Sequence, residues 1–81
     1  MTIHYDTGTD TLYVTFGDKS NSYGDARGSI ILMRDADTDA LTGITVLSFH
    51  RTKAAGELAN LPADLGISFE RDIEPKLAGI V

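Results

Sequence analysis

The stretch Leu12-Tyr13-Val14-Thr15-Phe16 decides the fold class of this 81-residue chain. Its aliphatic and Phe side chains recur at every second position, which is the period of a β-strand with one face on a core. All five residue types suit a half-buried pleated surface. The stretch therefore predicts a strand that packs through Leu12, Val14 and Phe16.

Three further segments on either side of it read as strands. Residues 3–5 are apolar at alternate positions, and residues 29–34 and 41–49 are rich in Ile, Leu, Met and Val. The polar, glycine-bounded residues 17–25 read as a loop. These segments predict an α+β fold built on a short antiparallel β-meander of four or five strands, the fifth at residues 67–69.

From Arg51 onward the pattern changes. Thr52 is placed to cap a short helix that runs to Leu61, although Gly56 inside it costs ~1 kcal/mol relative to Ala. No repeat or low-complexity linker divides the chain, so residues 1–81 are read as a single domain. Residues 1–50 form the β-meander, and residues 51–81 form a helical or irregular tail.

The strands at residues 29–34 and 41–49 supply most of the predicted core. Period-two register places seven side chains on one buried face: Leu12, Val14, Phe16, Ile30, Leu32, Ile44 and Val46. The opposite face is also apolar, with Ile31, Met33, Leu47 and Phe49. A sheet with one wet face should alternate cleanly, so the tail or a second subunit must cover this face.

We expect self-association to cover this apolar surface. The helix predicted in the tail is weak, and the chain end carries further apolar residues without a predicted contact: Leu77, Ala78, Ile80 and Val81. A two-fold dimer is the commonest oligomer and would cover both surfaces. We therefore expect a homodimer or a higher homo-oligomer.

Composition and charge exclude several classes of function. The chain has no Cys, which excludes disulfides, thiolate catalysis and thiolate zinc sites. Its net charge of −5 disfavours nucleic-acid binding and favours a basic protein partner, if it has a protein partner at all. No apolar run is long enough to span a membrane. The first residues lack the pattern of a signal peptide, so the expected compartment is the cytoplasm.

Within the first fifty residues, several short motifs occur in the same order as in a known family. The ordered set is Tyr5-Asp6, Asp10, Leu12-Tyr13-Val14, Ile30-Ile31-Leu32, Leu41, Gly43-Ile44 and Val46-Leu47. It resembles a family of short bacterial proteins classed as domain of unknown function 2283. That pattern opens with Tyr-Asp, a turn and Asp-x-Leu-Tyr, and closes with Gly-Ile-x-Ile/Val-Leu. The resemblance implies a fold and no catalytic residues, and the genes that neighbour some family members imply an antitoxin-like binder.

The two Asp-rich turns are the main candidate site. In a four-strand meander the first and third turns share one end of the sheet, which would group Asp6, Asp10, Asp35, Asp37 and Asp39. Such a group suits a hard divalent cation or a basic partner, and solvated turn residues explain it equally well. An EF-hand is excluded because Ala40 and Val46 stand where that loop needs Gly and Glu.

The two histidines, His4 and His50, are the candidates for metal binding or acid–base chemistry. In an open four-strand sheet both would lie at the end opposite the acidic turns and three strand spacings apart, about 14 Å, which is too far to share a metal ion. Ser48 and His50 offer a nucleophile and a base, but the sequence shows no acid at a useful spacing. The sequence thus predicts no catalytic residue, no metal and no cofactor.

These observations favour a non-enzymatic protein-binding or assembly module that forms homo-oligomers. Two alternatives stay open. One is an antitoxin-like partner of a small basic toxin, and the other is a metal-binding protein or enzyme that uses the acidic turns or the histidines.

Overall fold

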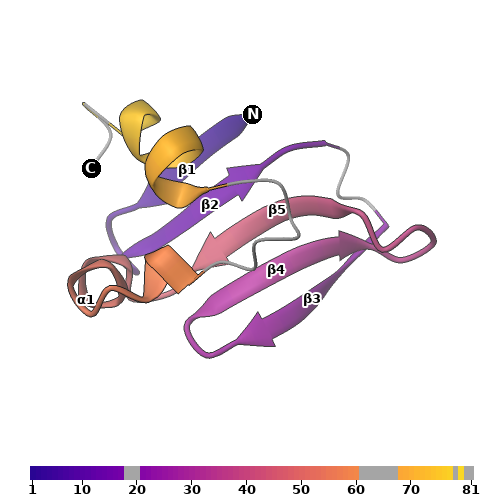
Figure 1. The fold of residues 1–81 in the computed structure, drawn as a ribbon, viewed down its shortest axis with the longest axis horizontal. Coiled ribbons are helices and arrows are strands. Elements are labelled where there is room, and N and C mark those ends of the chain that lie inside the picture. The colour runs from indigo at the N-terminus through magenta and orange to yellow at the C-terminus, as the bar shows by residue number, and fades with distance from the viewer. Residues whose placement is uncertain (18–20, 61–67, 78, 80–81) are drawn as a thin grey trace.

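Five antiparallel strands form one sheet, and helical turns cover one side of it (Figure 1). The computed structural model describes residues 1–17, 21–60, 68–77 and 79. The strands are β1 (Thr2–Asp6), β2 (Thr11–Thr15), β3 (Ser22–Arg27), β4 (Ile30–Asp35) and β5 (Leu41–Val46). The α+β class is confirmed, with five strands and a sheet that dominates the fold.

The strand order is β1-β2-β5-β4-β3, so the predicted simple meander is wrong. β1 and β2 form a hairpin, and β3, β4 and β5 form a three-stranded meander. The two units join where β2 pairs with β5, with Leu12 opposite Val46. As a result the end of β5 lies beside the start of β2, and this arrangement positions the site described below.

β3 begins inside the segment, residues 17–25, that the sequence predicted as a loop, and continues two residues beyond it. It forms because Gly28, at φ 64, supports a tight turn between Arg27 and Ile30. At Gly24 a side chain would crowd β4, since a Cβ there would lie 3.1 Å from a methyl carbon of Ile31. β3 pairs with β4 alone and is an edge strand, which is why its sequence is polar and lacks an apolar stripe.

The predicted core is largely confirmed. Leu12, Val14, Ile30, Leu32, Ile44 and Val46 are all buried, and Phe16 is partly buried against them. The tail contributes the other half of the same cluster, through Phe49, Leu58, Phe69, Ile73 and Leu77. The sheet and the tail therefore share one hydrophobic core.

The helical layer begins earlier than the sequence predicted. The strand predicted over residues 41–49 ends at Val46, and α1 spans Phe49–Ala54. Ser48 turns the chain with φ 47, and the predicted cap Thr52 lies inside the helix, where its hydroxyl donates to the Leu47 carbonyl at 2.9 Å. The prediction that Phe49 lies on the opposite face is wrong, because Phe49 is 1% exposed in the core.

In the described part of the chain, three short helical turns follow α1. They are η1 (Glu57–Asn60), η3 (Phe69–Ile73) and η4 (Glu74–Lys76). The fifth strand predicted at residues 67–69 is not formed at Phe69, which starts η3, while Ile67 and the predicted helix end Leu61 lie outside the described residues. Leu77 is buried in the core of its own chain, and Ala78, Ile80 and Val81 lie outside the described residues.

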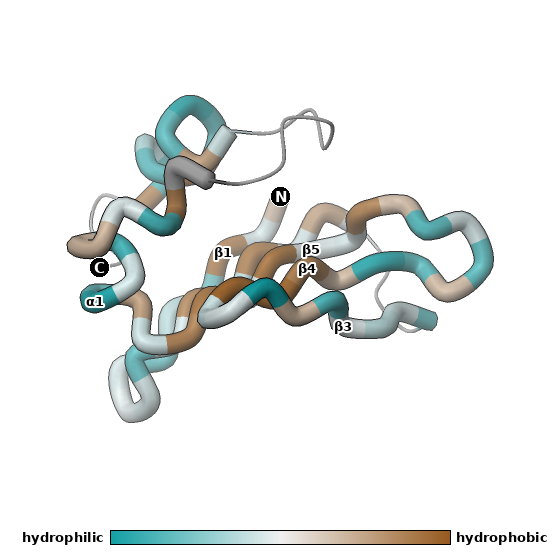
Figure 2. The backbone as a smooth tube through the Cα atoms, turned by 60° about the horizontal axis from the view of Figure 1, so that its bottom comes forward, coloured by the Kyte–Doolittle hydropathy of each residue, from teal (hydrophilic) through white to brown (hydrophobic). Residues whose placement is uncertain are grey.

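All of these helical turns lie on one side of the sheet (Figure 2). Among the described residues, no element covers the other side. No helix in this part of the chain is long and apolar enough to cross a membrane.

Candidate functional site

The structure brings Tyr5, Asp10 and His50 into contact, a grouping that we call the clasp. The Tyr5 hydroxyl donates to Asp10 Oδ1 at 2.5 Å, and His50 Nδ1 lies 2.7 Å from the same oxygen. The Tyr5 oxygen also lies 3.3 Å from Nδ1. Because a carboxylate only accepts hydrogen bonds, the Nδ1–H donates to Asp10 and the lone pair of the neutral ring is on Nε2.

Backbone contacts hold the clasp together. Because β2 pairs with β5, the chain that leaves β5 after Val46 passes close to Asp10 in the β1–β2 turn. The backbone of Asp10 is left-handed, with φ 53. The Asp10 carbonyl accepts the Phe49 N–H at 2.8 Å, and Asp10 Oδ2 accepts the His50 N–H at 3.3 Å. The start of α1 is therefore fixed to the β1–β2 turn.

The hydrogen bonds set the charge state of the clasp. The bond from the Tyr5 hydroxyl, followed by its burial and the charge of Asp10, raises the pKa of Tyr5 to about 12. The same bond, with further donors from the side chain and backbone of His50, lowers the pKa of Asp10. Asp10 is thus an anion with three donors, and the His50 side chain is 66% exposed.

Chemically, the clasp is a carboxylate–imidazole pair with one open nitrogen. A carboxylate in this position fixes the tautomer and the orientation of the ring. Such a pair can accept a proton or attack an electrophile. Sequence reasoning missed this pair because it placed His50 at the wrong end of the sheet, and the Gly28 turn signal would have revealed the extra strand.

The predicted acidic cluster is not formed. Asp6 and Asp10 lie at the β1–β2 turn, whereas the β4–β5 turn with Asp35, Asp37 and Asp39 lies at the opposite end of the sheet (Figure 1). The reason is again β3, which reverses the direction of every strand that follows it. Among the described residues, no group of three or more His, Asp or Glu side chains is arranged to hold a metal ion.

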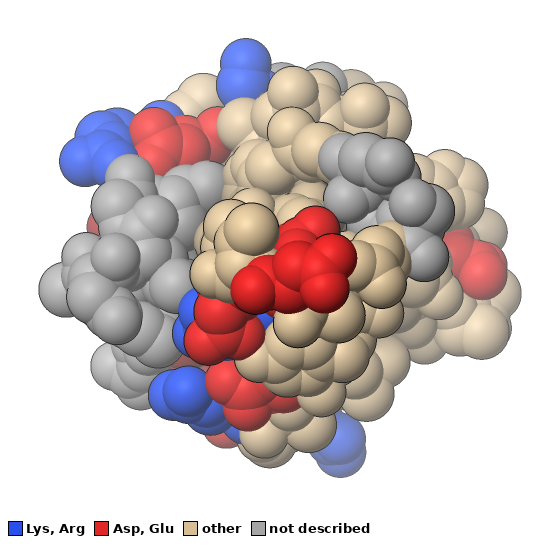
Figure 3. Space-filling model, turned by 90° about the vertical axis from the view of Figure 1, so that its right-hand side faces the viewer, with Lys and Arg blue, Asp and Glu red and all other residues tan. Residues whose placement is uncertain are grey.

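The carboxylates of the β4–β5 turn bond their own surroundings. Asp35 accepts the backbone N–H groups of Asp37 and Thr38 at 2.8 and 3.0 Å, and Asp37 accepts the Asn21 amide at 2.8 Å. Asp39 accepts the Tyr23 hydroxyl. Figure 3 shows acidic side chains gathered over this end of the molecule. They make an acidic surface that is held by turn geometry.

His4 lies apart from His50, on the uncovered side of the sheet. Its ring stacks on Tyr13, with centroids 6.0 Å apart and an interplanar angle of 24°. The two histidines therefore do not form a shared site.

Two neighbouring cross-strand rows at the centre of the uncovered side of the sheet make up what we call the open face, and Asp6 lies on the same side in the next row, opposite Thr11. The strand register gives the rows His4, Tyr13, Thr45, Ile31, Ala26 and Thr2, Thr15, Gly43, Met33, Gly24. None of the ten is Asp, Glu, Lys or Arg. The open face is thus a patch without formal charge (His4 neutral) on a chain whose net charge is −5.

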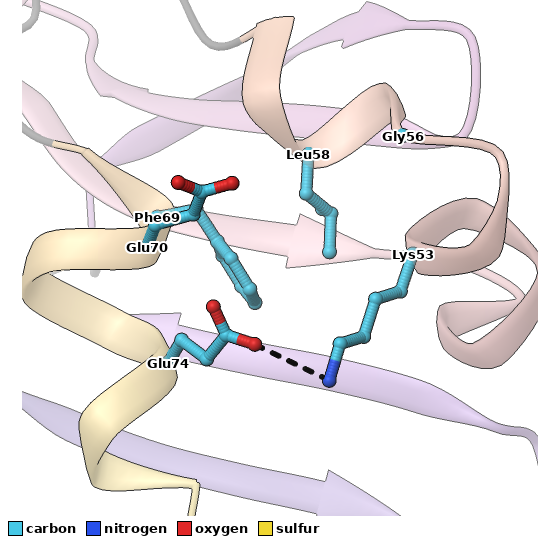
Figure 4. A pocket seen from close by; sticks show the side chains of 6 residues that line it. All are labelled: Lys53, Gly56, Leu58, Phe69, Glu70 and Glu74. Carbon is cyan, nitrogen blue, oxygen red and sulfur yellow. Dashed lines mark ion pairs between the residues drawn. The ribbon is translucent and has the colours of Figure 1, made fainter.

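A small hollow lies between the helical turns (Figure 4). Its volume is about 150 Å³, and its lining residues are Lys53, Gly56, Leu58, Phe69, Glu70 and Glu74. Lys53 Nζ and Glu74 Oε1 form an ion pair across it at 3.4 Å. This volume is below the ~300–1,000 Å³ of ordinary small-molecule pockets.

Comparison of the chain with protein-family models, with curated proteins and with solved structures finds no match. The resemblance of residues 1–50 to the family named above stays a prediction. The function is therefore argued from the site geometry.

Proposed function

We propose that the protein is a non-enzymatic assembly module that forms a homodimer through the open face. The observation that carries the proposal is this face: two rows without formal charge, on a side of the sheet that no helix of the described residues covers, in an acidic chain. Ile31 and Met33 are only partly buried there, and Tyr13 is 36% exposed. Covering these side chains removes apolar area from water, which stabilises an interface by ~25 cal/mol per Å².

Charge supports a second copy of the chain as the occupant. Two copies with a net charge of −5 each repel one another wherever their acidic surfaces meet. The open face lacks Asp and Glu in both of its rows, so it lets two copies approach with the least repulsion. A two-fold axis that lies in the plane of the interface would place the open face of one copy against that of the other.

The acidic surface of the β4–β5 turn favours a second candidate function, an antitoxin-like partner of a small basic toxin. Complementary charge speeds encounter and selects partners. Asp35, Asp37 and Asp39 would face the basic protein at the end of the sheet. In either case the compartment that we propose is the cytoplasm.

Sedimentation velocity of the whole chain tests the dimer. We expect a mass of twice 8.7 kDa at micromolar concentration for the wild type. Thr45→Lys places a charge at the centre of the open face, beside Tyr13 and Ile31, and should yield monomers. Thr7→Lys makes the same chemical change in the exposed β1–β2 turn and should leave the dimer intact.

Two results would overturn the proposal. One is a wild-type mass of 8.7 kDa throughout the concentration range. The other is a dimer that Thr45→Lys leaves unchanged, since that dimer would use a different surface.

A further inference from the structure

The geometry points to His50 as a nucleophilic acylation site, whose Nε2 takes an acyl group from small neutral activated acyl donors. The inference rests on the clasp and is independent of the dimer. Its first support is the 2.7 Å bond from Nδ1 to Asp10, which leaves the Nε2 lone pair of the neutral ring as the reactive position. Its second support is exposure, since the His50 side chain is 66% accessible to solvent.

Asp10 is a positioning residue in this scheme. When Nε2 attacks an electrophile the imidazole becomes positively charged, and the adjacent carboxylate stabilises that charge. Asp10 cannot readily rotate away, because Tyr5 and the His50 backbone N–H hold its two oxygens. The orientation of the His50 ring that the reaction needs is therefore fixed before the acyl donor binds.

The charges around the clasp select the class of donor. Asp6 and Asp10 lie in or beside the same turn, and the whole chain carries −5, which disfavours anionic donors such as acyl phosphates, with Arg51 beside His50 in α1 as an opposing charge. A neutral activated ester, anhydride or carbonate has no such barrier. The Nε2 lone pair bonds to the carbonyl carbon, and the bond to the leaving oxygen breaks with its electron pair. The Nδ1 proton stays in the bond to Asp10 during the attack and is then lost to water, which leaves a neutral acylimidazole.

His4 is an internal reference for this reaction. It is exposed like His50, but its ring contact in the described part of the chain is a stack on Tyr13, and no carboxylate there bonds to it. The inference depends on the bond between the ring and a carboxylate, which His50 has and His4 lacks among the described residues.

Diethyl pyrocarbonate, a neutral acyl donor that leaves a stable adduct, is the probe. The intact protein is treated at pH 8, where imidazoles are largely unprotonated, at a concentration at which sedimentation velocity shows monomers, so that His4 on the open face is not covered by a second copy. The modification rate of each histidine is read from peptide masses. We expect His50 to react about tenfold faster than His4, below the ~100-fold that positioned acid–base groups supply at enclosed sites. Asp10→Asn should bring the rate of His50 down to that of His4, while His4→Gln should leave the rate of His50 unchanged.

Nitrogen-resolved NMR of the imidazoles separates positioning from a merely structural role. We expect His50 to carry its proton on Nδ1 in the wild type and to lose this preference in Asp10→Asn. Equal rates for His4 and His50 in the wild type would overturn the inference, whether or not Asp10→Asn folds. So would a folded Asp10→Asn variant in which His50 reacts as fast as before.

Discussion

Gly43→Ala is expected to be one of the most damaging small substitutions in this chain. Gly43 lies in β5 at the centre of the sheet, opposite Thr15 on one side and Met33 on the other. A Cβ at this position would lie 2.6 Å from the carbonyl oxygen of Val14. That neighbour is backbone in a paired strand, so it cannot rotate out of the way as a side chain would.

The free-energy cost of Gly43→Ala comes from the movement that relieves this clash. β2 and β5 must separate locally, which strains the hydrogen bonds that join the two halves of the sheet. Overpacking of this kind costs ~1–3 kcal/mol, and a backbone clash belongs at the upper end. A domain of this size shifts its Tm by about 4–8 °C per kcal/mol, so the expected loss is roughly 10–20 °C.

Thermal unfolding followed by circular dichroism measures this loss, with Gly17→Ala as the matched control. At Gly17 a Cβ meets no atom within 4 Å and the backbone is not in the left-handed region, so Ala should be neutral or slightly stabilising. If the two variants melt within a few degrees of each other, the close approach of β2 and β5 at Gly43 is not present in solution.

Three further outcomes test other parts of the structure. Phe49→Ala should cost ~3–5 kcal/mol in urea unfolding because the ring is 1% exposed, and Phe16→Ala should cost less because that ring is only partly buried. Bonds from the Arg71 guanidinium and the Ser68 N–H hold the pKa of Asp72 at about 2, below its usual 3.8. The ionised Asp72 therefore contributes its full stability above pH 3.8, and this contribution is lost as the pH falls toward 2. Acid unfolding of Asp72→Asn should lack this pH-dependent loss of stability. Asp39 also raises the pKa of Tyr23, so ultraviolet titration of a Tyr23→Phe background should show one phenol near pH 12; a step that persisted when Tyr5→Phe is added would contradict the clasp.

The core could be predicted from sequence because its signal is local. Alternation along β2, β4 and β5 places Leu12, Leu32 and Ile44 on one face in any arrangement that pairs these strands antiparallel. β3 has no such signal. As an edge strand its side chains are largely exposed, so Tyr23, Asp25 and Arg27 carry no apolar period.

That one missed strand explains why the candidate sites were misplaced. Each added strand reverses the direction of those that follow, so counting four strands put His50 at the far end of the sheet from Asp10. It also placed Asp35 at the same end as Asp6. Errors in strand count therefore leave the core prediction intact and exchange the ends of the sheet, where sites built from turns are found.

The start of α1 was unpredictable for a different reason. A six-residue helix is far too short to be stable by its own propensity, so its position depends on the acceptors that the sheet offers. The Phe49 N–H bonds to the Asp10 carbonyl, and the Thr52 hydroxyl bonds to the Leu47 carbonyl. The Asp10 carbonyl comes within reach of Phe49 only once β2 and β5 have paired. The helix is thus a consequence of the sheet, and the clasp is the point at which the sheet fixes it.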